Sequence, residues 1–191
     1  DTKELKITLP EGVTINPSAA VGLAGCTLEQ LNAEKLDSPP GSGCPQEAKI
    51  GDIAIASPLV DEVLEGEIFV AAPDDPETAG QENPFDSFLA IYMVARNQEL
   101  GVIVKQAGEV QTDSQTGQVS TTFADIPQLP FSHIEASFRS GPRAPLATPG
   151  QCGTFAGEVK HTPWAEPGSP VVDTVSLQVA SGPGGSACPG P

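Results

Sequence analysis

Apolar and polar residues alternate through most of this chain with a period of two, the period of half-buried β-strands. Two such runs, 101–111 and 118–123, flank a polar turn that contains Asp113 and Gly117, and together they predict a β-hairpin. The run 88–95 is almost continuously apolar, which is typical of a strand buried on both faces at the centre of a sheet. The same pattern predicts further strands over residues 5–9, 50–57, 63–71, 133–139, 154–160 and 171–180.

One segment departs from this pattern and predicts a short helix near the N-terminus. Thr27 is a helix-capping residue, Gln30 follows it three positions later, and Leu28 and Leu31 lie about one turn apart. We therefore expect a helix over residues 27–34.

Composition narrows the fold class. Twenty prolines and twenty glycines among 191 residues disfavour long helices, because proline removes a backbone donor and glycine raises the cost of ordering the chain. Nine or ten short strands are typical of an all-β sandwich or barrel, and the unequal loops without a fixed repeat favour the sandwich. We expect a single β-sandwich domain over residues 1–191 with a Gly/Pro-rich tail at 181–191.

Four cysteines fall into two pairs along the chain, Cys26 with Cys44 and Cys152 with Cys188. Three disulfide connectivities exist, and the spacing favours the sequential one. A metal site is the alternative, but no Cys-x-x-Cys occurs and the two histidines do not match ligand spacings. Two disulfides, each stabilising by roughly 3 kcal/mol, persist in an oxidising compartment, so we expect a secreted, extracellular or cell-surface protein.

The net charge of −16 with only nine lysines and arginines excludes nucleic acids and anionic membrane surfaces as expected partners. No apolar run approaches the roughly 20 residues needed to span a bilayer, so no membrane insertion is expected. No cofactor is predicted, except that two acidic clusters could hold calcium, although neither has the spacing of an EF-hand loop. These clusters are Asp61, Glu62 and Glu65, and Asp74, Asp75 and Glu77.

Catalytic motifs are missing from the sequence, and we expect no enzyme. No Gly-x-Ser-x-Gly elbow occurs, and Ser132 and His133 are adjacent on a predicted strand, where neighbouring side chains point to opposite faces. Glycoside hydrolysis needs only two suitably spaced carboxylates. In a chain with 25 acidic residues such a pair is expected anyway, so it does not indicate a glycosidase.

Several residues are candidates for contacts with other protein domains or with copies of this chain. The terminal strand that carries Leu5, Ile7 and Leu9 could complete the sheet of a neighbour. Arg143 lies in a proline-stiffened loop, where it could bind an acidic group of a partner or carbonyls of its own loop. Trp164 could cap the core or anchor an interface.

A set of segments spread over most of the chain carries a family resemblance. They are residues 83–85, 101–102, 105, 121–123, 127–132 and 141–154, of which the last is the most specific. In these segments the chain resembles a domain of secreted bacterial surface proteins. The resemblance implies an exported, β-rich domain with no assigned catalytic activity. We therefore expect a non-enzymatic structural or adhesive module of the bacterial cell surface that is able to self-assemble. The alternatives are a filament subunit built by strand addition and a calcium- or glycan-binding module.

Overall fold

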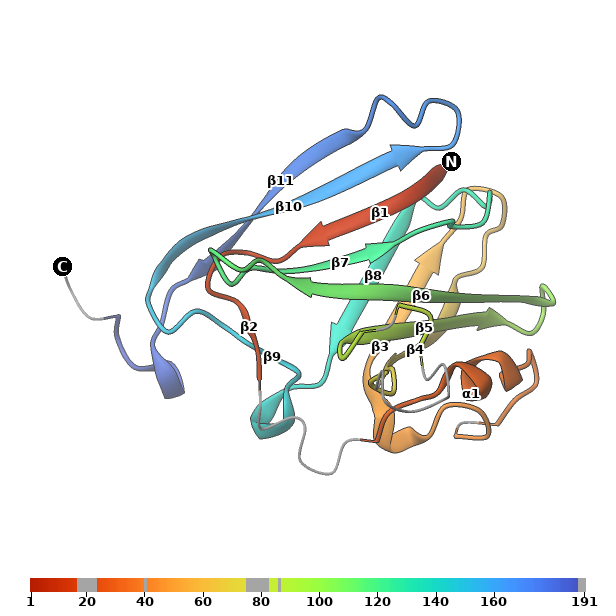
Figure 1. The fold of residues 1–191 in the computed structure, drawn as a ribbon, viewed down its shortest axis with the longest axis horizontal. Helices are drawn as coiled ribbons and strands as arrows, with labels where there is room; N and C mark the ends of the chain where they lie inside the picture. Colours follow the sequence, from red (N-terminus) through yellow and green to blue (C-terminus); the bar gives the residue numbers. More distant parts are fainter. Residues whose placement is uncertain (17–23, 40, 75–82, 86, 189–191) are drawn as a thin grey trace.

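A computed structural model describes residues 1–16, 24–39, 41–74, 83–85 and 87–188 (Figure 1). Nine strands form one antiparallel sheet, in the order β11-β10-β1-β7-β6-β5-β4-β3-β8. Their bounds are β1 Thr2–Thr8, β3 Lys49–Ala56, β4 Leu64–Val70, β5 Ala90–Asn97, β6 Val102–Thr112, β7 Val119–Phe123, β8 His133–Phe138, β10 Gly153–Pro163 and β11 Val171–Val179. Two further strands, β2 Thr14–Ile15 and β9 Leu146–Ala147, pair with each other.

The strand pattern of the sequence is confirmed, and so is the short helix. Helix α1 spans Leu28–Ala33 and begins with a reciprocal capping box between Thr27 and Gln30. Short 3-10 turns cover Gln46–Ala48, Gly141–Arg143 and Pro183–Gly185. None of the helices in the described ranges is long and apolar enough to cross a membrane.

The expected sandwich is not confirmed, because the nine strands belong to one hydrogen-bonded sheet. The sheet curls so that β8 crosses behind β6 and β7 (Figure 1). Twist accumulates from strand to strand, so a sheet of this width can enclose its own apolar face. Residues 124–132 cross the open side: Ile126 N–H donates to Lys3 O, and Ser132 N–H donates to Ala56 O.

The concave face holds one apolar cluster, in which Ile53, Leu64 and Ile68 are buried. The opposite, convex face is covered by α1 and its disulfide, which pack on Phe69 and Tyr92. This arrangement explains why β5 is apolar on both faces. The apolar run itself begins before the strand, since Phe88 lies outside β5 with 71% of its surface exposed.

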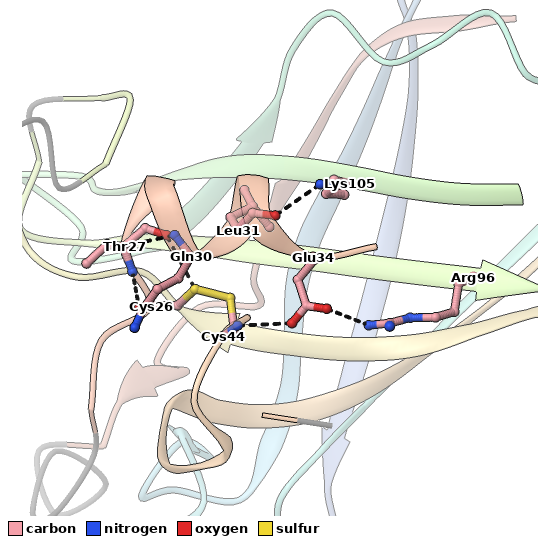
Figure 2. Close-up of a disulfide and its surroundings, with 8 residues drawn as sticks. All are labelled: Cys26, Thr27, Gln30, Leu31, Glu34, Cys44, Arg96 and Lys105. Carbon is pink, nitrogen blue, oxygen red and sulfur yellow. Dashed lines mark hydrogen bonds and ion pairs between the residues drawn. A yellow bond between two sulfur atoms is a disulfide. The ribbon is translucent and has the colours of Figure 1, made fainter. Parts of the chain in front are cut away.

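Both disulfides form in the predicted sequential pairing, Cys26–Cys44 and Cys152–Cys188, with Cα–Cα distances of 5.0 and 5.8 Å. The first ties α1 to the segment that leads into β3 (Figure 2). The second ties the segment after β11 to the start of β10. The two bonds suggest an oxidising, extracellular environment.

Candidate functional site

Strand β11 forms one end of the sheet, and in the part of the chain that the structure describes it pairs with no strand other than β10. Its register with β10 is unbroken from the pair Gly153–Val179 to the pair His161–Val171. The valines Val171, Val172 and Val175 are 58%, 49% and 39% exposed. Natural edge strands are usually shortened, bulged or protected by lysine or proline, and none of these features interrupts the nine residues of β11. The strand therefore presents a long, unpaired edge.

The two faces of β11 differ. Val175 and Leu177 pair with Gly157 and Phe155 of β10, on the same sheet face as the buried core residue Leu5. The opposite face of β11 carries Val172 and the hydroxyl or amide side chains of Thr174, Ser176 and Gln178, whereas the one charged residue of the strand, Asp173, lies on the apolar face. The apolar face thus continues the concave side of the sheet beyond the part that the rest of the chain covers.

The other end of the sheet, β8, is shorter and more polar. It has six residues, pairs only with β3 and carries Glu135 in its centre. Phe138 at its end is 41% exposed. Each of the two end strands carries one acidic residue, and β11 offers the longer edge.

A groove of about 590 Å³ lies on the convex face over β3, β4, β5 and β8. The register places four residues in one row across it, Arg96, Glu65, Ala54 and Glu135, each directly opposite the next. The small Ala54 leaves a hollow between the two glutamates. Opposite residues in such rows have Cβ atoms about 5 Å apart, so the two carboxylates flank the hollow from neighbouring strands.

Lys49 lies at one side of this groove, between two carboxylates. Its Nζ is 2.7 Å from Asp52 Oδ1 and 2.8 Å from Glu67 Oε1. Partial burial disfavours the charged amine, but the hydrogen bonds to Asp52 and Glu67 and their charges outweigh it, and the pKa of Lys49 is raised. The lysine is therefore held as a cation, neutralised by residues of its own chain.

Arg96 connects the groove to the layer that covers the convex face (Figure 2). It donates to Glu34 Oε2 at 3.2 Å, and to the carbonyls of Lys35 and Ser38 at 3.1 Å. The Glu34 side chain is only 2% exposed, and its Oε1 accepts from Cys44 N–H at 3.0 Å. These contacts fix the helix and disulfide on the sheet, so Glu34 and Arg96 have a structural role.

The concave interior contains a second, narrow cavity of about 60 Å³, lined almost entirely by apolar side chains. Leu64 and Phe123 contribute from the sheet, and Leu129 and Phe131 from the crossing segment. Because so few polar groups line it, the cavity offers little hydrogen bonding to a polar ligand. It carries no argument for a functional site.

The predicted calcium ligands do not converge in the described part of the chain. Asp61 and Glu62 are exposed between β3 and β4, whereas Glu65 lies in the groove and Asp74 is buried. Asp75 and Glu77 lie outside the described residues. Among the residues that the structure describes, no group of three His, Cys, Asp or Glu side chains could hold a metal ion.

The terminal strand predicted as a donor lies inside the sheet of its own chain. β1 pairs with β10 on one side and β7 on the other, and Leu5 is buried while Ile7 is half-buried. Leu9 N–H donates to Val119 O at 2.8 Å. Neither edge of this strand is open for pairing with another molecule.

The other two predicted contact residues occupy different surroundings. Trp164 bonds within its own chain: its Nε1 donates to Ile126 O at 2.9 Å, its N–H donates to Asp1 O, and Lys3 Nζ lies 5.2 Å from its ring centroid. This supports the capping role. Arg143 is exposed at the end of a 3-10 turn, whose following carbonyl, Ala144 O, accepts from Asn16 Nδ2 at 2.8 Å.

Neither the open edge nor the row of groove residues was identified from the sequence. Both depend on which strands are neighbours, and alternation along one strand carries no such information. The sequence carries one indication of the open edge, since Asp173 is the only charged residue between Val171 and Val179.

No protein-family model matches the chain, and neither curated proteins nor solved structures give a significant match to it.

Proposed function

We propose that this chain is a non-enzymatic structural or adhesive module of the bacterial cell surface, and that it self-associates through the edge of β11. The observation that carries the proposal is the uninterrupted, nine-residue edge with exposed valines. An unpaired edge offers a row of N–H and C=O groups to another strand, and adding a strand satisfies them.

The cell-surface setting is supported by one further observation and by the resemblance that the sequence carries. Both disulfides are formed, and such bonds persist outside the reducing cytoplasm. The segments that resemble secreted bacterial surface proteins include residues 141–154, which lead into β10 and contribute Cys152 to the second disulfide. On this proposal the secreted module contacts copies of itself rather than a nucleic acid or a membrane.

Self-association is tested with an edge-blocked variant, Thr174→Lys/Ser176→Lys. Both side chains are exposed on the polar face of β11, so the lysines protect the edge without entering the core. The matched control is Ser114→Lys/Gln115→Lys in the exposed β6–β7 turn, which changes the net charge equally.

Light scattering over a concentration series measures the native mass of each protein, and negative-stain imaging shows the shape of its particles. We expect the wild-type chain and the control to form dimers or larger particles, and the edge-blocked variant to remain monomeric. A wild-type chain that stays monomeric throughout the series would contradict the proposal, as would association that the β11 lysines leave unchanged.

The groove supports a second candidate, a glycan-binding module, or a calcium-binding module in which the two glutamates supply only part of the ligand set, since no group of three acidic side chains gathers among the described residues. Glu65 and Glu135 flank the hollow over Ala54, and the volume of about 590 Å³ is in the range of ligand sites. Any ion that binds the native state preferentially raises its melting temperature. Calorimetry in millimolar calcium, with Glu135→Gln as the comparison, tests this candidate: a calcium-dependent rise that the variant loses supports it, and equal melting temperatures with and without calcium exclude calcium binding.

A further inference from the structure

We infer that the occupant of the β11 edge is β11 of a second copy, paired antiparallel about a two-fold axis at Val175. The inference rests on the proposed self-association and specifies its geometry. It predicts a closed dimer in which the two sheets continue into one, rather than an open filament.

The register follows from the two-faced pattern of β11. Directly opposite residues share a sheet face, so the apolar faces of two copies join only if odd-numbered residues meet odd-numbered residues. Pairing about Val175 satisfies this and uses all nine residues. Val171 then lies opposite Val179 of the second copy, Asp173 opposite Leu177, and Val175 opposite its own equivalent.

The charge on the strand selects the same register. Pairing about Asp173 would place two like charges directly opposite, which destabilises a sheet. With the axis at Val175, the two Asp173 residues are four positions apart, or about 14 Å along the strands. That separation exceeds the Debye length of about 8 Å at physiological salt, so their repulsion is largely screened.

The other sheet end is a poorer partner for β11. A contact between β11 and β8 of the next copy would be heterologous and would propagate as a filament. β8 has only six residues, so three residues of β11 would remain unpaired. The β11–β11 contact leaves none unpaired and is closed by its two-fold symmetry.

Single cysteines on the apolar face of β11 test this geometry directly. Opposite Cα atoms in antiparallel strands are about 4.5–5.5 Å apart, a distance that a disulfide can bridge, so Val175→Cys should form a covalent dimer under mild oxidation. The matched control is Val171→Cys, another exposed valine on the same face. Its equivalents would be eight positions apart, roughly 27 Å, and cannot be bridged.

The outcomes separate the inference from the proposal on which it rests. A Val175→Cys dimer without a Val171→Cys dimer supports the two-fold register. Filaments or particles that the β11 lysines abolish, but in which Val175→Cys does not cross-link, overturn the register and leave self-association standing. A chain that never associates overturns both.

Two opposite charge substitutions at Leu177 give an independent test that needs no added cysteine. In the inferred register Leu177→Lys places a cation opposite Asp173 of the second copy, twice per dimer, whereas Leu177→Asp places an anion there. Both variants lose the same leucine packing. We expect the lysine variant to dimerise at least roughly tenfold more tightly than the aspartate variant at low salt, with the difference shrinking in salt. Equal dissociation constants would overturn the register.

Discussion

Replacing Arg96 with methionine should destabilise the protein by about 3 kcal/mol, because it leaves the carboxylate of Glu34 buried without its cation. Arg96 donates to Glu34 at 3.2 Å and to two backbone carbonyls at 3.1 Å. Removing one partner of a buried ion pair costs about 3–5 kcal/mol. The Arg96 side chain is 17% exposed, so water reaches part of the site and the lower end of that range applies.

The matched control is Lys105→Met on the neighbouring strand. Lys105 also donates to two carbonyls of the covering layer, Leu31 O at 3.2 Å (Figure 2) and Asn32 O at 2.9 Å, and no carboxylate of the described residues pairs with it. Its loss should cost only about 1 kcal/mol. Urea unfolding gives the free energy of unfolding of both variants, provided that its slope against urea concentration is the same as in the wild-type chain.

A double variant separates the buried charge from the lost hydrogen bonds. Glu34→Gln keeps an oxygen that can accept from Cys44 N–H but removes the charge that Arg96 compensates. Combined with Arg96→Met, it should recover about 2 kcal/mol of the loss. If Arg96→Met costs no more than Lys105→Met, or if the second substitution adds to the loss, the buried charge is not the cause.

Four further substitutions, at Lys49, Glu67, Thr116 and Gly66, have outcomes that follow from particular contacts. The destabilisation caused by Lys49→Met should stay constant from neutral pH up to the usual lysine pKa of 10.5 and vanish as the pH rises through the raised pKa, and Glu67→Gln should lower that pKa in an NMR titration. Backbone hydrogen bonds from Thr116 and Gln115, and the Thr116 hydroxyl, lower the pKa of Asp113 below 3.8, so the turn should lose this support only as the pH falls through that lowered pKa. Thr116→Ala should raise the pKa, which a carboxyl NMR titration checks. Gly66→Ala should cost about 2 kcal/mol in urea unfolding, because its Cβ would overlap the backbone of β5.

Local features of the fold could be predicted from the sequence because their causes are local. Alternation placed the strands, and the Thr27–Gln30 pair placed α1 with its capping box. The sequential disulfides could be favoured because each cysteine pairs with the next one along the chain, at separations of 18 and 36 residues. For the strands and the helix, the relevant residues are close together along the chain.

The sheet order could not be predicted in this way. β1 lies between β7 and β10, so residues 2–8 pair with residues that are more than a hundred positions away. Because β1 lies between these two strands, it is not an edge strand of the sheet, and β11 forms that edge instead. The choice between a sandwich and a curled sheet is also non-local, because it depends on twist summed over nine strands and on the crossing segment that ends at Ser132.

The distribution of charge connects the acidity of the chain with its open edge. The whole chain carries −16, but between Gly153 and Val179 only three acidic residues and one lysine occur. Screening limits electrostatic repulsion to charges within about 8 Å, so two copies can approach along β11 while acidic surfaces elsewhere repel closer contacts. On the proposed function, the acidic surface disfavours unspecific aggregation, and the weakly charged edge directs association to one strand. Adding lysines at Thr174 and Ser176 therefore tests more than net charge, since it lowers the overall negative charge and yet should prevent association.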